Sequence, residues 1–494
     1  MTTTTVPGIV HEGPLAIQAG KSMLGTPSWI KQYFVLDDCM NLSFFRADKL
    51  KGQIVICHET TVRLSDSKPH TFELRTPYVV IQAQAKNDTD RDGWILALQK
   101  VIQAASSEKR SETFRKIRGK AQEMQKTKPT GNGTHVFLAN NQQFEVDVRY
   151  DFKRVLGQGA YGTVVSVSDS TTGTDVAIKK IKSVFDNVID AKRILREIRI
   201  MKFLKHKNIS NVIDLMRPPS ESAEEFNDVY IVMPLMDTDL HRVIYSQQKL
   251  TDQHIQFLLF QLLSAVHFME SARVIHRDLK PPNILVNAAC ELKICDFGLA
   301  RTMAEEMEKD PTLYVVTRWY RAPELLFGCN RYTSAIDLWS VGCILAELIG
   351  RKPLFPGDDY LEQIQLIVDV LGQPSQSDLE SLRDPGDTEE GPAVRYLRDL
   401  PAKTKTPWKD VPQLSKATPL CLDLLDKLLT FDANKRISAE QAIKHPYLAS
   451  YHSQKLEKCD RTFTDTADLD ESQEASKSAM RAAICKEIEF FRQY

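Results

Sequence analysis

The first part of the chain alternates between apolar and polar residues, which is typical of β-strands with one buried face. We expect strands at residues 32–36, 42–46, 54–57, 71–75 and 78–83. Residues 92–105 then change to a helical period. The apolar residues of this segment share one face of the predicted helix: Trp94, Leu98, Val101 and Ile102. The pattern predicts an antiparallel β-barrel or sandwich capped by one C-terminal helix.

This stretch resembles a pleckstrin-homology domain. The resemblance rests on Gly13-Pro14-Leu15 in the first strand, on WIKQYFVL at residues 29–36, and on the helix that contains Trp94. The family often binds phosphoinositide head groups through basic residues near the first hairpin, which here would be Lys21 and Lys31.

Two observations weigh against strong lipid binding. Gln32 stands where lipid-binding members usually have an arginine, and residues 1–105 hold 11 Lys and Arg against 10 Asp and Glu. So small an excess of positive charge steers weakly to an anionic membrane. A phosphoinositide ligand and a protein or autoregulatory contact of this domain therefore both stay open.

Residues 106–128 carry 8 Lys and Arg against 3 Asp and Glu, a local excess of positive charge. We interpret residues 106–143 as a basic linker that leads into a second domain. A solvated basic tether is the simpler interpretation of this charge, and a contact with acidic lipid or an acidic protein surface is the alternative.

The composition of the 494-residue chain is that of an ordinary globular protein, with 42% apolar and 26% charged residues. Its formal net charge of −1 predicts no attraction to nucleic acid. We find no signal peptide and no transmembrane stretch. The nine cysteines show no metal-ligand spacing, which suits a reducing compartment. We expect the protein to be located in the cytoplasm or nucleus, and peripheral recruitment to a membrane stays open.

Five nucleotide-handling motifs follow one another between residues 157 and 324. They are GQGAYGTV at 157–164, VAIK at 176–179, HRDLKPPN at 276–283, DFG at 296–298 and APE at 322–324. A single glycine-rich motif is a weak signal, but five in this order are hard to obtain by chance. Together they predict transfer of the γ-phosphoryl group of ATP to a protein hydroxyl.

The nucleotide-binding residues follow from these motifs. Glycines let the backbone approach the phosphates without a Cβ clash. Lys179 lies on an apolar strand, where an ammonium group needs partners, and Glu197 in a helical segment is the best candidate beside the α- and β-phosphates. The predicted ATP-binding set is Leu156, Gly157, Gly159, Gly162, Val164, Ala177, Lys179, Met233, Pro234, Met236 and Leu285. Of these, Pro234 and Met236 resemble the backbone contacts of a kinase hinge, with Met233 as gatekeeper.

The catalytic residues are predicted in the same way. Asp278 would accept or orient the substrate hydroxyl, and Lys280 would neutralise charge on the γ-phosphoryl group. Lysine at this position is typical of Ser/Thr kinases. Asn283 and Asp296 supply hard oxygen ligands for Mg²⁺. Thr317 completes the predicted catalytic set with Lys179 and Glu197.

From residue 144 onward the chain resembles a mitogen-activated protein kinase. The most specific signal is Thr312-Leu313-Tyr314, followed by VVTRWYRAPE at 315–324. The resemblance implies a bilobal kinase fold, with a β-rich N-lobe at about 150–233 and a helical C-lobe at about 237–450. It also implies a structural ion pair between Glu324 and Arg436, and a C-terminal extension, residues 451–494, packed on the kinase.

The same resemblance implies how the enzyme is activated and which partners it binds. Members are activated by dual phosphorylation of the Thr-x-Tyr motif, because each phosphate orders its loop against arginines. Those arginines would be Arg196, Arg277 and Arg301 for phosphothreonine, and Arg318 and Arg321 for phosphotyrosine. Expected partners are an upstream dual-specificity MAP kinase kinase, protein substrates with Ser/Thr-Pro, and phosphatases. Leu313 replaces the usual Glu, Gly or Pro, which leaves the upstream kinase open.

The sequence thus predicts a proline-directed serine/threonine protein kinase preceded by a pleckstrin-homology-like domain. A cyclin-dependent kinase fits less well, because that family lacks this Thr-x-Tyr motif. The alternative from another class is a scaffold whose front domain targets the chain while the kinase fold serves as a docking surface. The complete catalytic set speaks against a scaffold.

Overall fold

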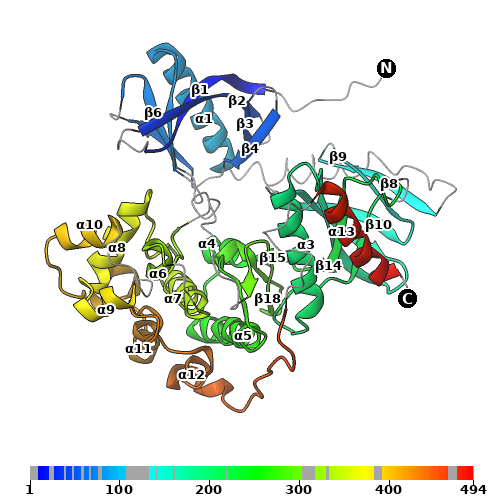
Figure 1. Ribbon diagram of the computed structural model, residues 1–494. Coiled ribbons are helices and arrows are strands. Elements are labelled where there is room, and N and C mark those ends of the chain that lie inside the picture. The colour runs from blue at the N-terminus through cyan, green and yellow to red at the C-terminus, as the bar shows by residue number, and fades with distance from the viewer. Residues whose placement is uncertain are drawn as a thin grey trace. The chain divides into compact units, whose positions relative to one another are not determined.

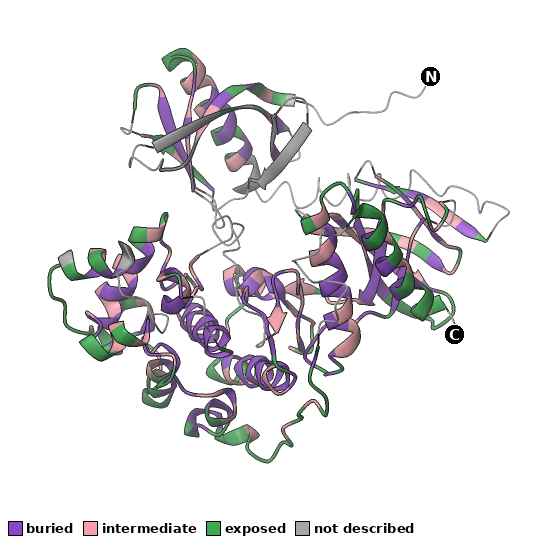
Figure 2. Cartoon of the chain, viewed as in Figure 1, coloured by how far each residue is buried: buried purple, intermediate pink, exposed green. Residues whose placement is uncertain are grey.

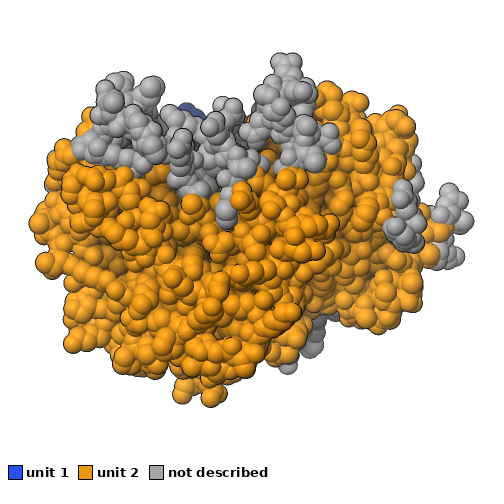
Figure 3. Space-filling model, turned by 60° about the horizontal axis from the view of Figure 1, so that its bottom comes forward, with its two compact units in different colours: residues 1–126 blue, residues 127–494 orange. Residues whose placement is uncertain are grey.

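The structure is a computed structural model of the whole chain. It describes residues 9–21, 27–37, 41–46, 49–56, 60–65, 68–75, 80–106, 133–140, 142–159, 162–218, 221–302, 318–329, 333–382, 392–464 and 476–492. The chain divides into two compact units, residues 1–126 and residues 127–494 (Figure 3).

The first unit is built on one antiparallel sheet. Its strands are β1 (Ile9–Lys21), β2 (Pro27–Asp37), β3 (Asn41–Arg46), β4 (Lys49–Val55), β5 (Thr61–Leu64), β6 (Thr71–Arg75) and β7 (Val80–Gln84). The strand order is β4-β3-β2-β1-β7-β6-β5. In the described residues no ladder joins β4 to β5, so the sheet is open rather than a closed barrel.

Helix α1 (Asp88–Ser106) supplies the predicted apolar face to this sheet (Figure 1). Trp94, Leu98 and Val101 are buried with strand residues such as Phe34 and Phe72, and Ile102 packs against them. The helix begins one turn earlier than the predicted residue 92. Asn87 explains this, because its side chain accepts a hydrogen bond from the Asp90 backbone N–H at 2.8 Å.

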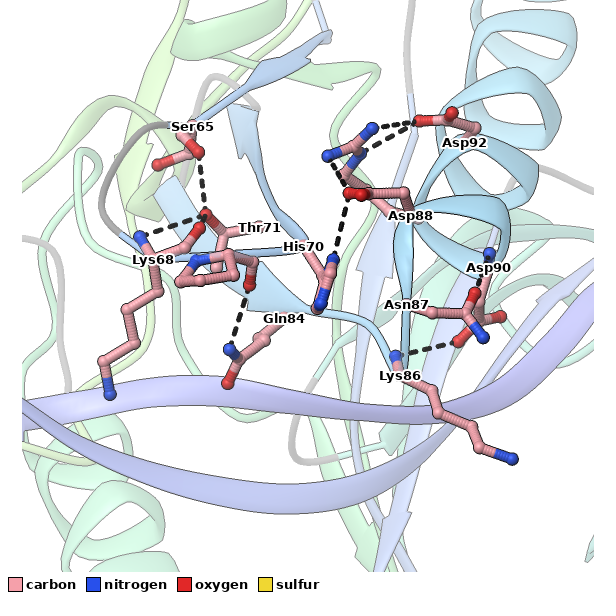
Figure 4. Close-up of polar contacts among 12 residues, drawn as sticks. Ser65, Lys68, His70, Thr71, Gln84, Lys86, Asn87, Asp88, Asp90 and Asp92 are labelled. Atoms are coloured by element: carbon pink, nitrogen blue, oxygen red, sulfur yellow. Dashed lines mark hydrogen bonds and ion pairs between the residues drawn. The ribbon is translucent and has the colours of Figure 1, made fainter.

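Ion pairs also fix the start of α1 (Figure 4). The Asp88 carboxylate contacts His70 Nδ1 at 3.0 Å and the Arg91 guanidinium, and Arg91 Nε donates to Asp92 at 2.9 Å. Acidic groups in the first turn of a helix are also stabilised by the helix dipole.

Strand β5 was not predicted from the sequence. It is an edge strand of only four residues, three of them exposed, so its alternation of polar and apolar residues is too short to mark a strand by itself.

The N-lobe of the second unit is a five-stranded antiparallel sheet in the order β10-β11-β12-β14-β13. The strands are β10 (Tyr150–Gly159), β11 (Gly162–Asp169), β12 (Thr174–Ile181), β13 (Asp214–Met216) and β14 (Val229–Pro234). Helix α3 (Val188–Phe203) packs on this sheet, and a hairpin of β8 (Thr134–Ala139) and β9 (Gln142–Asp147) precedes it. The expected β-rich lobe is confirmed.

The C-lobe is helical. Its helices are α4 (Leu240–Tyr245), α5 (Asp252–Ser271), α6 (Pro323–Leu326), α7 (Ala335–Gly350), α8 (Tyr360–Leu371), α9 (Gln376–Ser381), α10 (Pro392–Asp399), α11 (Pro419–Leu428) and α12 (Ala439–Ile443). Helices α5 and α7 form its buried centre, and α7 is buried from Ala335 to Leu348 (Figure 2). The last helix, α13 (Lys477–Arg492), returns to the N-lobe and packs against α3 and β13.

Short strands of the C-lobe carry the catalytic segments. They are β15 (Thr238–Asp239), β16 (Val274–Ile275), β17 (Ile284–Val286), β18 (Leu292–Ile294) and β19 (Arg301–Thr302). Strands β15, β17 and β18 form one small sheet, and β16 pairs with β19. Among the described residues, no helix has both the length and the apolar character needed to cross a membrane.

Candidate active site

The glycine-rich turn lies between β10 and β11, whose ladder ends at the pair Gly159 and Gly162. Gly162 has φ = 147°, and a Cβ added there would lie 1.8 Å from the carbonyl oxygen of Lys180. A Cβ on Gly157 would meet no atom of the described residues within 4 Å. The fold therefore requires glycine at position 162, whereas position 157 stays open to an approaching ligand.

Lys179 on β12 and Glu197 on α3 form the expected ion pair. Lys179 Nζ donates to Glu197 Oε1 at 2.7 Å, and the two side chains are only 15% and 7% exposed. Burial raises the pKa of the Glu197 carboxyl, and the charge of Lys179 acts in the opposite direction. Burial also disfavours the Lys179 ammonium, but the charges of Glu197 and Asp296 outweigh it and raise the pKa of Lys179. The lysine therefore stays charged at neutral pH.

The predicted adenine-binding residues come from adjacent strands. Ala177 lies opposite Met233 in the β12–β14 ladder, and Val176 lies opposite Pro234. Leu156 on β10 and Val164 on β11 are partly buried against the same core. Met236 follows β14 and Leu285 lies on β17, both half-buried. These residues line the boundary of the two lobes.

The catalytic loop brings three predicted residues into direct contact. Lys280 Nζ donates to Asp278 Oδ2 at 2.7 Å. Asn283 Nδ2 donates to the same oxygen at 3.0 Å and to the Asp278 carbonyl at 2.9 Å. Among the described residues, both side-chain bonds to this carboxylate go to Oδ2, so Oδ1 is the oxygen suited to accept a bond from a further hydroxyl.

Asp337 supports the catalytic loop, a role that was not predicted from the sequence. Its carboxylate accepts hydrogen bonds from the backbone N–H of His276 at 2.8 Å and of Arg277 at 2.9 Å. Burial raises the pKa of Asp337, and the interactions with His276 and Arg277 oppose the rise. Arg277 has φ = 69°, so the loop holds a left-handed residue in place. The available signal was a carboxylate near the start of the largely apolar helix α7.

Asn283 and Asp296 are held close by the backbone between them. The Cys295 N–H donates to the Asn283 carbonyl at 2.9 Å, and His276 Nε2 lies 3.0 Å from the Cys295 carbonyl. Because Asn283 uses Nδ2 toward Asp278, its Oδ1 is the atom suited to a hard cation. Burial raises the pKa of the Cys295 thiol, which makes it a poor nucleophile.

The arginines expected to clamp the phosphosites come from several elements. Arg196 on α3 and Arg277 are buried, and Arg301 on β19 faces Ile275, two residues before Arg277. Arg318 Nη1 donates to the Asp358 carbonyl at 3.2 Å, and the Arg321 N–H donates to the Arg318 carbonyl at 3.0 Å. The predicted residues Thr312, Tyr314 and Thr317 lie outside the described residues.

No group of three or more His, Cys, Asp or Glu side chains suited to a metal occurs in the part of the chain that the structure describes. The predicted Mg²⁺ site would use one amide and one carboxylate of the chain, Asn283 and Asp296, and its remaining ligands would be phosphate and water.

A β-rich lobe, a helical lobe and this polar cluster at their boundary define a protein kinase. The family model for the protein kinase domain matches residues 150–448, and that for the PH domain matches residues 9–103.

Similarity to known proteins narrows the class of protein kinase. The chain is 50% identical over 326 residues to "Mitogen-activated protein kinase 4a" of Physcomitrium patens, covering 66% of this chain and 84% of the relative. It is also 50% identical over 338 residues to "Mitogen-activated protein kinase homolog NTF6" of Nicotiana tabacum, covering 68% and 88%. "Mitogen-activated protein kinase 4" of Arabidopsis thaliana is 50% identical over 326 residues, with 65% and 83% covered.

This chain belongs to the mitogen-activated protein kinase family and carries a PH domain before its kinase domain. It is an ATP-dependent serine/threonine protein kinase. The expected family and enzyme class are thus confirmed.

Proposed function

We propose that this enzyme phosphorylates serine or threonine followed by proline, and that Asp278 is its catalytic carboxylate. Asp278 Oδ1 accepts or orients the substrate hydroxyl, while the bonds to Oδ2 keep the carboxylate fixed. Lys280 stands beside Asp278, where it offsets negative charge on the transferring group. Thr317 belongs to the same proposed set.

ATP and Mg²⁺ are general requirements of the protein kinase family. We assign Lys179, held by Glu197, to the α- and β-phosphates, and Asn283 and Asp296 to Mg²⁺. The ion supplies charge neutralisation on the phosphates. Val164, Ala177 and Leu285 would hold the adenine, and Pro234 and Met236 would offer backbone groups to it.

Activation rests on Thr312 and Tyr314. We propose that an upstream dual-specificity kinase phosphorylates both residues, and that phosphatases reverse the step. Each phosphate adds roughly two negative charges at neutral pH, which the proposed arginines can bind. Arg196, Arg277 and Arg301 receive phosphothreonine, and Arg318 and Arg321 receive phosphotyrosine.

The observation that carries this proposal is the convergence of two independent contacts at one place. Lys179 and Glu197 meet from β12 and α3, and Asp278, Lys280 and Asn283 meet within the catalytic loop. Charged groups are costly to bury. Their presence in both arrangements therefore supports an active kinase over a scaffold that has lost catalysis.

The direct test is phosphate transfer to paired peptides that differ only in Ser-Pro against Ser-Ala. Wild-type protein and Asp278→Asn are assayed before and after treatment with an active dual-specificity kinase, and mass spectrometry quantifies phosphate on Thr312 and Tyr314. Selective Ser-Pro activity that follows double phosphorylation and is lost in Asp278→Asn supports the proposal. Inactivity of the doubly phosphorylated wild type would favour the scaffold alternative.

For the PH domain we propose regulation by contact with protein, including this chain's own kinase domain, ahead of a phosphoinositide ligand. Lys31 is exposed on β2, and the neighbouring Gln32 lacks the charge that a lipid phosphate prefers. Matched rates for the full chain and for a chain that starts near Gly131, before and after activation, would contradict regulation by the front domain.

A further inference from the structure

The C-terminal helix α13 lies along the outer surface of α3, the helix that carries Glu197 (Figure 1). Its buried face consists of Met480, Ala483, Ile484, Glu487 and Ile488. Four of these residues are apolar, and Glu487 is the exception. Burial of a carboxylate in such an apolar helix contact is costly unless it pairs with charged partners.

The partners of Glu487 are two basic residues of α3. Arg199 Nε donates to Glu487 Oε1 at 2.9 Å, and Lys202 Nζ pairs with Oε2. The side chains of Glu487 and Arg199 are only 9% and 12% exposed, so water screens this pair weakly. Lys202 Nζ also lies 4.3 Å from the ring centroid of Phe490, one turn further along α13.

Helical geometry places these contacts on the side of α3 away from the catalytic lysine. Successive residues of an α-helix turn by about 100°. Arg199 and Lys202 are therefore rotated by about 200° and about 140° from Glu197. Glu197 points to Lys179, and the two basic residues point to α13. A force on Arg199 and Lys202 thus acts on the rotation of α3 that decides whether Glu197 reaches Lys179.

We propose that Glu487 is a positioning residue for phosphoryl transfer. It holds α3 in the rotation that keeps Glu197 on Lys179, and it does so through Arg199 and Lys202. The inference rests on the proposed role of the Lys179–Glu197 pair, which is to orient the ATP phosphates for transfer. It makes the end of the chain, 290 residues from Glu197, part of what aligns the active site.

The other polar anchors of α13 contact different elements and supply a matched control. Arg481 Nε donates to the Phe226 carbonyl at 3.0 Å, and its guanidinium lies 4.7 Å from the Phe185 ring centroid. Arg492 pairs with Asp147 on β9 and lies 3.5 Å from Asp214 on β13. Arg481 thus attaches the same helix to the N-lobe, and among the described residues it forms no hydrogen bond or ion pair with α3.

The test compares Glu487→Gln with Arg481→Gln in the full chain, each doubly phosphorylated on Thr312 and Tyr314. An interaction expressed in the transition state lowers kcat more than it changes KM. We expect kcat of Glu487→Gln to fall by roughly tenfold, with the KM for ATP within about twofold of wild type. Arg481→Gln keeps the wild-type kcat, although its thermal stability falls.

A charge exchange between the two helices distinguishes a positioning role of Glu487 from a role only in attaching α13 to the kinase domain. Glu487→Arg combined with Arg199→Glu restores one pair across the two helices, and we expect it to recover most of the lost kcat. If Glu487→Gln does not fold, Arg199→Gln with Lys202→Gln removes the same contact from α3.

Three results would overturn the inference: an unchanged kcat in Glu487→Gln, an equal loss in Arg481→Gln, or no recovery on charge exchange. Inactivity of the phosphorylated wild type would be a separate result, since it would contradict the proposed function itself.

Discussion

Arg436 and Glu324, 112 residues apart in the chain, form a bidentate ion pair inside the C-lobe. Arg436 Nη1 lies 2.8 Å from Glu324 Oε1, and Nη2 lies 3.0 Å from Oε2. The two side chains are 0% and 4% exposed. Arg436 also donates to the carbonyls of Ala335 and Thr430. The pair therefore joins α6, which follows the predicted phosphosites Thr312 and Tyr314 in the chain, to the start of α7 and to the loop after α11.

Removing one partner of this pair is expected to destabilise the kinase domain strongly. Arg436→Met leaves the Glu324 carboxylate buried without its counter-charge, which costs about 3–5 kcal/mol. Denaturant unfolding followed by fluorescence measures the loss. Lys435→Ala is the control, because Lys435 is exposed and its ion pairs with Asp378 and Asp432 are screened by water. Equal losses in the two variants would contradict the prediction.

Asp278→Asn is expected to lower kcat by about 10²–10⁴-fold while the KM for ATP changes little. The amide keeps the shape of the side chain and can still meet Asn283, but it no longer accepts a proton. Steady-state kinetics with a Ser-Pro peptide gives both constants. Asp252→Asn is the control, because that carboxylate accepts a hydrogen bond from Tyr447 in the C-lobe and serves no proposed catalytic step. A kcat within a few-fold of wild type would remove Asp278 from the mechanism.

Two glycines of the phosphate turn are expected to respond differently to alanine. Gly162→Ala forces a Cβ toward the Lys180 carbonyl at 1.8 Å and strains φ = 147°, so we expect a loss of about 1–3 kcal/mol and a raised KM for ATP. A Cβ at position 157 meets no described residue within 4 Å, so we expect Gly157→Ala to keep the wild-type stability. Thermal unfolding and ATP titration of the two variants provide the comparison. A stable Gly162→Ala with normal ATP affinity would show that the turn can shift.

Glu347 is expected to make stability depend on pH. It accepts hydrogen bonds from Tyr320 Oη at 2.6 Å and Tyr245 Oη at 3.1 Å, and burial raises its pKa to about 7 from 4.5. The folded protein therefore holds this proton when the unfolded chain has lost it. The contribution is complete below pH 4.5 and is lost as the pH rises to about 7.

Replacing Glu347 with glutamine isolates this effect. We expect the stability of Glu347→Gln relative to wild type to rise between pH 4.5 and pH 7 and then to level off, by a total of roughly 3 kcal/mol. Melting curves across this range measure the difference, with the exposed Glu291→Gln as control. A difference that stays constant with pH would mean that the carboxyl titrates as in the unfolded chain.

The sequence identified the fold class and most of the proposed site. The apolar face of α1 follows from its helical period, and the strands around Lys179 and Met233 follow from continuous apolar runs, because such patterns depend only on side-chain direction along one element. The motif order predicted Lys179, Asp278, Asn283 and Asp296. The Lys179–Glu197 and Arg436–Glu324 pairs were expected as well, the second from the family resemblance.

Other features were decided by the tertiary structure. Asp337 supports the catalytic loop from a helix 60 residues away, and Glu487 meets α3 from the end of the chain. Strand β5 gains its place by pairing with β6, although its own residues are largely exposed. No period in the sequence marks these contacts, because each depends on which distant segment the folded chain brings alongside. The sequence by itself therefore determined the chemistry and the elements of this kinase, whereas the tertiary structure decided which buried charges meet, since burial and pairing are properties of the packed lobes.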